Sequence, residues 1–292
     1  MLKPDKVLIV ANPTAGGYRG DLLEQVRGGL NAAGFDATLH LTTHAGEIGE
    51  LCKNPDFDAG ILVIAGGDGS VNDALAGLQD CPLPPTLAVI PFGTANVLAL
   101  ELNLPRRADE IIQMIIAGRT VSLHSGTANS HPFVLMTSSG FDAEVVHALP
   151  LSLKRRFGKL AYVVTALRLI RKRSPVQLRA EVNGTMIEGK LIVVTNGRYY
   201  GGPFCVAPQA SVSHPGLYLL VLERDDPLSI LRFALGLVTN RLGRTKGVCV
   251  MACDTLRLTS APPSAVQIDG DPYGTTPAEI AAAPESFAII VP

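Results

Sequence analysis

Residues 61–78 read ILVIAGGDGSVNDALAGL, and this stretch decides the fold of the N-terminal half. An apolar run at 61–65 is followed by three glycines around an aspartate, and then by apolar residues at helical spacing. Such a succession predicts a buried strand, a tight turn and an amphipathic helix. A strand, a glycine turn and a helix in this order are typical of a parallel α/β sheet.

The same succession recurs up to about residue 119. Apolar runs rich in β-branched residues or leucine suit strands that are buried on both faces. The predicted strands are 7–11, 37–41, 61–65 and 87–91. Two apolar stripes predict helices between them: one runs from Leu22 to Leu30 and stops at Gly34, and the other starts at Val71 with Ser70 as its predicted N-cap. We therefore expect an α/β lobe with a parallel sheet over residues 1–122.

The second half of the chain is richer in strands. Strand-like segments cover 133–137, 176–182, 186–195, 217–222, 249–251, 256–259 and 287–291. Asn183 and Gly184 form a strong hairpin signal. Helical spacing predicts a long helix near 153–171 and a second one near 228–238. These features predict a C-terminal β-sandwich lobe with helical additions over residues 123–292, whose last strand packs back toward the first lobe.

Composition narrows the class of partner. A net charge of -1 and a pI near 6.6 give no broad positive field, so we do not expect nucleic-acid binding. The five cysteines are scattered without a Cys-x-x-Cys pair, which indicates reduced thiols. The apolar run at 7–11 is too short for a signal peptide, and the run at 228–238 is far below the roughly 20 residues of a membrane span. The expected location is cytoplasmic, with no transmembrane segment.

The turn at 66–70 has the composition of a phosphate-binding loop. Gly66, Gly67 and Gly69 allow close approach of backbone N–H groups to an anion, and a helix starting near Ser70 adds a favourable dipole. Asp68 is unfavourable in such a turn unless a cation or a proton transfer requires it. A plainer interpretation is an ordinary tight turn in which Asp68 caps the following helix.

Two further turns have the same placement after a predicted strand. One contains Asn12, Pro13 and Gly16, and the other, at 91–96, contains Gly93, Thr94 and Asn96. Each alone is common loop chemistry. Because ligands of open α/β sheets bind beyond the carboxyl ends of the strands, three such turns at one sheet edge favour phosphate chemistry. The sequence contains neither a P-loop nor a dinucleotide fingerprint after the first strand.

These motifs resemble those of a known family. The turns ANPTAGG (11–17), GGDGS (66–70) and FGTAN (92–96) are similar to the three signature turns of the diacylglycerol kinase/sphingosine kinase catalytic-domain family, in its bacterial lipid kinase branch. This family lies within the NAD kinase-like superfamily. The likeness continues in the same order through SSGFDAEVV (138–146), KRRFGKLAY (154–162), NGRYYGGPFCVAPQAS (196–211) and QIDGDPYGTTP (267–277).

The resemblance implies an ATP-dependent lipid kinase with ATP and Mg²⁺ as cofactors, and a lipid substrate presented at a membrane surface. The expected cytoplasmic location is then peripheral to the inner face of the membrane. It assigns Asp68, Asp269 and Asp271 to catalysis, with Asp68 and Asp269 near the catalytic magnesium. The positions that it assigns to the nucleotide are Asn12, Pro13, Gly16, Thr43, Gly66, Gly67, Gly69, Ser70, Gly93, Thr94, Asn96 and Arg155. It also implies that the nucleotide lies in a cleft between the two lobes.

Three departures from the family pattern bear on these expectations. Ser122 stands where an aspartate is usual, and Asp271 replaces the glutamate of the late Asp-Gly-Glu motif. Around Ser213, His214 and Tyr218 too few oxygen ligands remain for the structural magnesium of some relatives, so we expect no structural metal there.

Several alternatives stay open from the sequence. An NAD kinase-like enzyme and a catalytically weak lipid-binding or regulatory protein are the rival functions. The basic residues of 154–173 are either the solvated face of a helix or a contact to anionic membrane or phosphate. The identity of the lipid is not encoded in a motif, and a homodimer is neither indicated nor excluded.

Overall fold

The computed structural model describes residues 3–148 and 176–292. The chain forms two compact units: unit 1 comprises Met1–His124 and Glu285–Pro292, and unit 2 comprises Ser125–Pro284. Each unit is described separately below. The helix expected at 153–171, with its basic residues, lies outside the described residues.

Unit 1 is built on a six-stranded sheet with strand order β2-β1-β3-β4-β20-β5. The strands are β1 (Lys3–Ala11), β2 (Asp36–Leu41), β3 (Ala59–Gly66), β4 (Thr86–Pro91), β5 (Thr120–Leu123) and β20 (Phe287–Ile290). The first four are mutually parallel, as predicted. The last predicted strand, which was expected to pack back toward the first lobe, belongs to this sheet: β20 runs parallel to β4 and antiparallel to β5.

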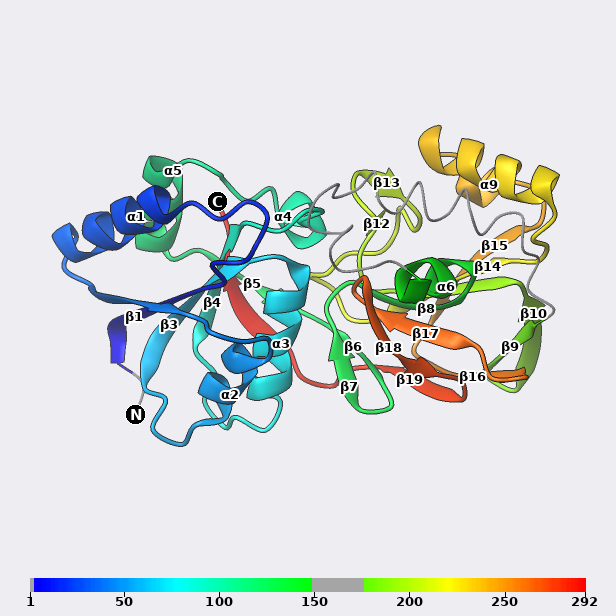
Figure 1. Ribbon diagram of the computed structural model, residues 1–292, viewed down its shortest axis with the longest axis horizontal. Helices are drawn as coiled ribbons and strands as arrows, with labels where there is room; N and C mark the ends of the chain where they lie inside the picture. The colour runs from blue at the N-terminus through cyan, green and yellow to red at the C-terminus, as the bar shows by residue number, and fades with distance from the viewer. Residues whose placement is uncertain (1–2, 149–175) are drawn as a thin grey trace. The chain divides into compact units, whose positions relative to one another are not determined.

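Two pairs of helices cover the two faces of this sheet (Figure 1). One face carries α1 (Gly20–Ala32) and α5 (Ala108–Ala117), and the other carries α2 (Glu47–Lys53) and α3 (Asp68–Leu78). The predicted stripe of α1 is confirmed, because its apolar side chains from Leu22 to Leu30 are buried and the chain reverses at Gly34 with φ +93°. The short helix α4 (Val97–Glu101) follows the turn after β4.

The start of α3 differs from the prediction that Ser70 is its N-cap. The helix begins at Asp68, and its N-cap is Gly67 in an extended conformation. Ser70 lies in the first turn, where its backbone N–H donates to the Gly67 carbonyl at 3.0 Å. A Cβ at Gly66 would lie 2.3 Å from Ser70 Oγ, so a side chain at Gly66 would collide with Ser70 in this turn.

Unit 2 contains two six-stranded sheets with antiparallel pairings. The first has the order β10-β9-β16-β19-β6-β7, and the second β15-β14-β11-β8-β17-β18. The strands of the first sheet are β6 (Gly126–Ala128), β7 (His131–Phe133), β9 (Gln177–Val182), β10 (Thr185–Gly189), β16 (Thr255–Ala261) and β19 (Ala278–Ala282). Those of the second are β8 (Met136–Gly140), β11 (Leu191–Thr195), β14 (Leu217–Leu222), β15 (Val248–Cys253), β17 (Ala265–Ile268) and β18 (Asp271–Thr275).

The apolar core of unit 2 fits a sandwich. One cluster of buried side chains draws on strands of both sheets, including Phe133, Leu178 and Val194. A second cluster, which includes Leu191, Val193 and Leu220, gathers residues of the second sheet with others that follow β12 (Tyr199–Tyr200) and β13 (Phe204–Cys205). Since side chains of a strand alternate between its faces, the second sheet is buried on both. The predicted β-sandwich with helical additions is confirmed.

Two predicted strands of unit 2 are interrupted in the structure. The segment 133–137 is divided between β7 and β8, and 186–195 is divided between β10 and β11, which belong to different sheets. An apolar run does not reveal where a chain crosses from one sheet to the other. The hairpin at Asn183 and Gly184 is confirmed, since both residues have positive φ and join the antiparallel pair β9 and β10.

In the described part of unit 2 the chain also forms α6 (Phe141–Ala148), α9 (Pro227–Val238) and the 3₁₀ helix η1 (Leu242–Arg244). The helix predicted near 228–238 is confirmed as α9. The Asp226 carboxylate caps it by accepting the Ser229 backbone N–H at 3.1 Å. The pKa of Asp226 is lowered to about 2, mainly because the Ser229 hydroxyl donates a hydrogen bond to its carboxylate. The hydrogen bond from the Ser229 backbone N–H is the second cause.

Candidate functional site

The three glycine turns of unit 1 lie together at the carboxyl ends of β1, β3 and β4. Backbone hydrogen bonds join them: Gly17 N–H donates to the Phe92 carbonyl at 2.9 Å, and Phe92 N–H donates to the Gly66 carbonyl at 2.8 Å. The Asn12 N–H donates to the Ala65 carbonyl at 3.2 Å. The turns 12–17, 66–70 and 91–96 therefore form one unit, called here the three-turn site.

Two glycines of the three-turn site are required by its packing. A Cβ on Gly93 would lie 2.5 Å from the Cα of Gly67, and a Cβ on Gly17 would lie 2.9 Å from the Phe92 carbonyl oxygen. Gly16 differs, because a Cβ there would meet nothing within 4 Å. The space beside Gly16 is open, so packing within the protein gives no reason for a glycine at this position.

Asp68 joins two of the turns through its carboxylate. Its Oδ2 accepts the Val97 N–H at 3.0 Å and its Oδ1 accepts the Leu98 N–H at 3.1 Å, both from the first turn of α4. These amides stabilise the negative charge that looked unfavourable in a glycine turn. Asp68 therefore binds the start of a neighbouring helix, where the plainer interpretation expected it to cap its own.

Asn96 has a buried oxygen without a partner. The residue adopts a left-handed conformation with φ 49°, and its Nδ2 donates to the Gly93 carbonyl at 2.7 Å. Only 8% of the residue is exposed, and its Oδ1 has no hydrogen-bond partner among the described residues. A buried acceptor left unpaired is unfavourable by about 1–3 kcal/mol, which makes it a candidate contact for a ligand.

Thr43 lies in the loop after β2 and is held by Glu47. The Thr43 hydroxyl donates to Glu47 Oε2 at 2.8 Å, and its backbone N–H donates to the same oxygen at 2.5 Å. The pKa of Glu47 is lowered to about 2. The two largest causes are the hydrogen bond from the Thr43 backbone N–H and the hydrogen bond with the His40 side chain. Glu47 was not recognised from the sequence, and its role is not that of a helix cap, because the N-cap of α2 is Gly46.

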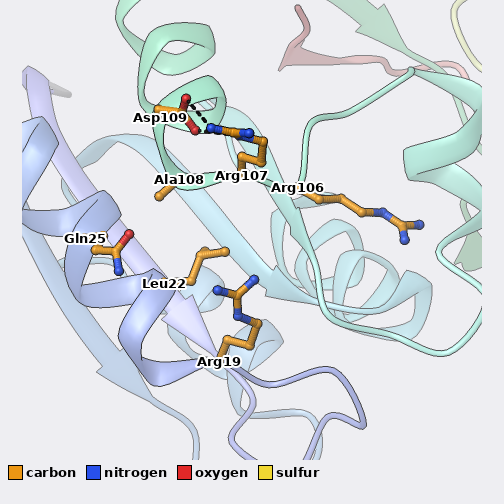
Figure 2. A pocket seen from close by; sticks show the side chains of 7 residues that line it. All are labelled: Arg19, Leu22, Gln25, Arg106, Arg107, Ala108 and Asp109. Carbon is orange, nitrogen blue, oxygen red and sulfur yellow. Dashed lines mark hydrogen bonds and ion pairs between the residues drawn. The ribbon is translucent and has the colours of Figure 1, made fainter.

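A pocket of about 380 Å³ lies between the starts of α1 and α5 (Figure 2). Its lining residues are Arg19, Leu22, Gln25, Arg106, Arg107, Ala108 and Asp109. None of the predicted site residues is among them, but Arg19 follows Gly17 of the three-turn site by two positions. In Figure 2 the Arg107 guanidinium turns toward Asp109, with which it forms hydrogen bonds of 3.1 and 3.2 Å, whereas Arg106 extends away from it.

In unit 2, Asp269 is held by three backbone amides. Its Oδ1 accepts the N–H groups of Leu135 and Met136 at 2.9 Å each, and its Oδ2 accepts the Val134 N–H at 2.8 Å. The residue has φ 48° in the turn between β17 and β18. These bonds tie that turn to the link between β7 and β8. Asp271 is exposed at the start of β18.

A second carboxylate of unit 2, Asp142, has only uncharged partners in the bonds described for it. Ser138 and Tyr200 donate their hydroxyls to it, and Gln267 Nε2 donates at 3.3 Å. Desolvation raises the pKa of Asp142 in spite of these hydrogen bonds. Its motif, which also contains Ser138, had been noted in the sequence, but Tyr200 and Gln267 lie 58 and 125 positions away and gave no local signal.

Few side chains in the described part of the chain are placed to bind a metal ion. Within residues 3–148 and 176–292, no group of three or more His, Cys, Asp and Glu side chains is placed to bind an ion. The three-turn site offers the carboxylate of Asp68 and the unpaired oxygen of Asn96. This set fits magnesium, which commonly binds one or two carboxylates plus substrate phosphates. Arg155, predicted to contact phosphates, lies outside the described residues.

Comparison with known families identifies the chain. Residues 6–128 match the diacylglycerol kinase catalytic domain, and residues 136–291 match the YegS C-terminal NAD kinase beta sandwich-like domain. The chain belongs to the diacylglycerol kinase family. The family resemblance expected from the three turns is thereby confirmed, and members of this family use ATP.

Individual relatives agree with this family. A diacylglycerol kinase of Bacillus subtilis is 26% identical over 97% of this chain and 95% of its own length. A diacylglycerol kinase of Staphylococcus carnosus is 29% identical over 65% of this chain and 62% of its own.

Solved structures share the fold. A structure of a protein from Bacillus anthracis has a TM-score of 0.82 at 24% identity. The match covers 99% of this chain and 95% of the other. Another, of a diacylglycerol kinase from the same organism, has a TM-score of 0.75 at 23% identity, with coverages of 99% and 97%.

None of the helices in the described ranges has the length and apolarity that a membrane crossing requires.

Proposed function

We propose that this member of the diacylglycerol kinase family is an ATP-dependent lipid kinase that transfers the γ-phosphate of Mg-ATP to the hydroxyl of diacylglycerol or a similar lipid alcohol. One observation carries the proposal. The three-turn site joins backbone amides, an open glycine and a buried unpaired oxygen at the carboxyl edge of a parallel sheet, where such folds bind nucleotides.

The residues proposed to bind the nucleotide come from the three turns and from the loop after β2. They are Asn12, Pro13, Gly16, Thr43, Gly66, Gly67, Gly69, Ser70, Gly93, Thr94 and Asn96. Backbone N–H groups and the start of α3 would face the phosphates, since helix starts and glycine turns bind anions. Gly16 leaves room for the nucleotide, and Asn96 Oδ1 would gain the partner that it lacks within the protein. Arg155 remains a proposed phosphate contact.

Asp68 is the proposed catalytic carboxylate. Because the amides of Val97 and Leu98 fix both oxygens in direction, the carboxylate is positioned before substrate arrives. Its charge would orient the attacking hydroxyl or a magnesium ion, which when bound spreads the charge of the transferred phosphoryl group. Phosphoryl transfer depends mainly on such positioning and charge stabilisation.

The late motif receives a revised role. Asp269 was expected near magnesium, but its oxygens accept three backbone amides, so we assign it to holding the loops of unit 2. Asp271, exposed beside it, remains the proposed catalytic carboxylate of this motif.

The test is transfer of labelled phosphate. The protein is incubated with γ-labelled ATP and magnesium, and with either vesicles containing single lipid alcohols or soluble NAD. We expect label in diacylglycerol or another lipid alcohol, and none without magnesium. Label in NAD would replace the proposal with an NAD kinase, and lipid binding without any transfer would replace it with a regulatory protein.

A matched pair of variants tests the site. Asp68→Asn should lower turnover by about 10²-fold or more, because the carboxylate charge acts on the reacting groups. The new amide leaves one backbone N–H without its acceptor, so the free energy of unfolding should fall by about 1–3 kcal/mol. Turnover is therefore compared at a temperature where circular dichroism shows both proteins folded.

The control is Asp36→Asn, which makes the same change at an exposed position at the start of β2, the opposite edge of the sheet. It should retain wild-type turnover. Normal turnover in Asp68→Asn would remove Asp68 from the proposed mechanism.

A further inference from the structure

Helix α9 of unit 2 presents an apolar face to solvent. Leu228, Leu231, Leu235 and Val238 are 52%, 54%, 55% and 69% exposed. Spacings of three and four residues place them on one side of the helix. In Figure 1, α9 lies on the outside of unit 2. Isolated exposed leucines are common, whereas four along one short helix form a contiguous apolar surface of the kind that marks an interaction site.

The opposite face already holds the helix in place. Phe233 and Leu237 pack against the buried cluster that includes Leu220 and Leu242. At Gly236 the helix closely approaches η1 and the residue after it, since a Cβ there would lie 2.3 Å from Thr245 Oγ1. The outward side chains are therefore not needed to attach α9 to unit 2, and they remain available for a partner.

The charges of α9 and of the segment that follows it have one sign, although the acidic residues Glu223, Asp225 and Asp226 directly precede the helix. Residues 227–246 contain Arg232, Arg241, Arg244 and Lys246 and no acidic residue, while the whole chain has a net charge of -1. All four basic residues are exposed. An apolar stripe flanked by arginine and lysine is typical of a helix that lies in the surface of an anionic membrane.

We propose that α9 docks unit 2 on an anionic lipid surface, with Leu228, Leu231, Leu235 and Val238 entering the boundary of the acyl chains. The basic residues at 232, 241, 244 and 246 would contact lipid phosphates. Twelve residues suffice to lie in the interface but not to span the bilayer. The choice of lipid rests partly on the proposed function, because a kinase of membrane lipids must reach its substrate from the surface.

A second copy of the chain fits this face less well. In a symmetric dimer each α9 would face the same surface of its partner. Four positive charges of residues 227–246 on each side would then be brought together, and acidic residues are present only before the helix, at Glu223, Asp225 and Asp226. Like charges facing each other disfavour association, whereas lipid phosphates complement them.

Tryptophan fluorescence tests the docking directly, because the chain contains no tryptophan. Leu235→Trp places a single indole on the outer face of α9. On vesicles of phosphatidylcholine with phosphatidylglycerol we expect its emission to shift to shorter wavelength and its quenching by iodide to decrease. The control, Met186→Trp, places the indole at a position of β10 that is similarly exposed, 52%, and should show neither change.

Sedimentation with the same vesicles measures the energetics. Leu231→Ser/Leu235→Ser should reduce partitioning by roughly tenfold or more, since burial of one leucine contributes about 1.5–3 kcal/mol and tenfold corresponds to about 1.4 kcal/mol. Leu83→Ser/Met186→Ser removes two other exposed apolar side chains and should bind like wild type. Arg241→Ala/Arg244→Ala should weaken binding to anionic vesicles several-fold and leave binding to pure phosphatidylcholine unchanged.

Three outcomes would overturn the proposal. They are wild-type partitioning of the double serine variant, equal spectra of the two tryptophan variants on vesicles, and a dimer that the serine substitutions dissociate. Vesicle binding needs neither ATP nor a substrate lipid. Docking can therefore fail while lipid phosphorylation persists, and phosphorylation can fail while docking persists, so the two proposals are tested separately.

Discussion

Asp68 in unit 1 and Asp269 in unit 2 are two carboxylates that both accept backbone amides, yet their surroundings differ. Asp68 accepts two amides in a site that also contains an open glycine and an unpaired buried oxygen. Asp269 accepts three amides that join two loops of a sandwich. A carboxylate in a glycine-rich motif can thus serve a ligand or the fold, and the neighbouring groups indicate which.

The largest stability effect is expected at Asp269. Asp269→Ala removes three hydrogen bonds to a charged group, each worth about 1.5–3 kcal/mol, and should lower the free energy of unfolding by roughly 3 kcal/mol or more. Urea denaturation monitored by circular dichroism measures this. Asp271→Ala, at the exposed neighbouring position, is the control and should change stability by less than about 1 kcal/mol. A stable Asp269→Ala that lacks activity would return Asp269 to the catalytic residues.

A smaller effect is expected where the turns of unit 1 touch. Gly93→Ala would place a Cβ 2.5 Å from the Cα of Gly67, and backbone cannot yield as easily as a side chain. We expect a loss of about 1–3 kcal/mol, as for other overpacked sites. Thermal melting measures it. Unchanged melting would mean that the two turns separate without penalty, and that their contact does not define the site.

Asp142 is a third carboxylate, whose pKa is raised because burial disfavours its charge. A raised folded pKa means that the folded state binds the proton more tightly, so this group lowers stability as pH rises from 3.8 toward the folded value. Asp142→Asn cannot ionise, so its free energy of unfolding should rise relative to that of wild type over that range. At pH 7 it should equal the wild-type value or exceed it by about 1 kcal/mol. Melting temperatures from pH 3 to 7 test this. If the stability of the variant instead falls relative to wild type as pH rises, the folded protein favours the ionised carboxylate.

The smallest stability effect is expected at Gly16. Gly16→Ala meets no atom within 4 Å, so melting should shift by no more than about 0.5 kcal/mol in free energy. If the nucleotide lies beside Gly16, the same methyl group should raise the KM for ATP several-fold and leave kcat less affected. Initial rates at varied ATP separate the two parameters. Equal values for variant and wild type would move the nucleotide away from this turn.

The sequence predicts unit 1 well because its signals are local. A buried run, a glycine turn and an apolar stripe repeat along the chain, and parallel strands bring the turns to one edge without further information. The packing between turns could not be predicted in the same way. That Asp68 binds the amides of Val97 and Leu98 depends on a contact across 29 and 30 positions, which no motif encodes.

Unit 2 was predicted as a class but not in detail. Short apolar segments identify strands, but the divisions at 134–135 and 190 depend on which sheet each half joins. The partners of Asp142 and Asp269 lie up to 135 positions away, so their roles appear only in three dimensions. In α9 the outer leucines look like core residues in the sequence, because periodicity alone does not tell a packed face from an exposed one.

Strand β20 lies between β4 and β5, and β5 pairs with no other strand of that sheet. Strand β20 (Phe287–Ile290) follows all the described strands of unit 2 in the chain. While the chain is being made, the sheet of unit 1 therefore exposes an open edge at β4 and leaves β5 unattached until the strands of unit 2 have been synthesised. The unit whose sequence is synthesised first is the one whose sheet is completed last.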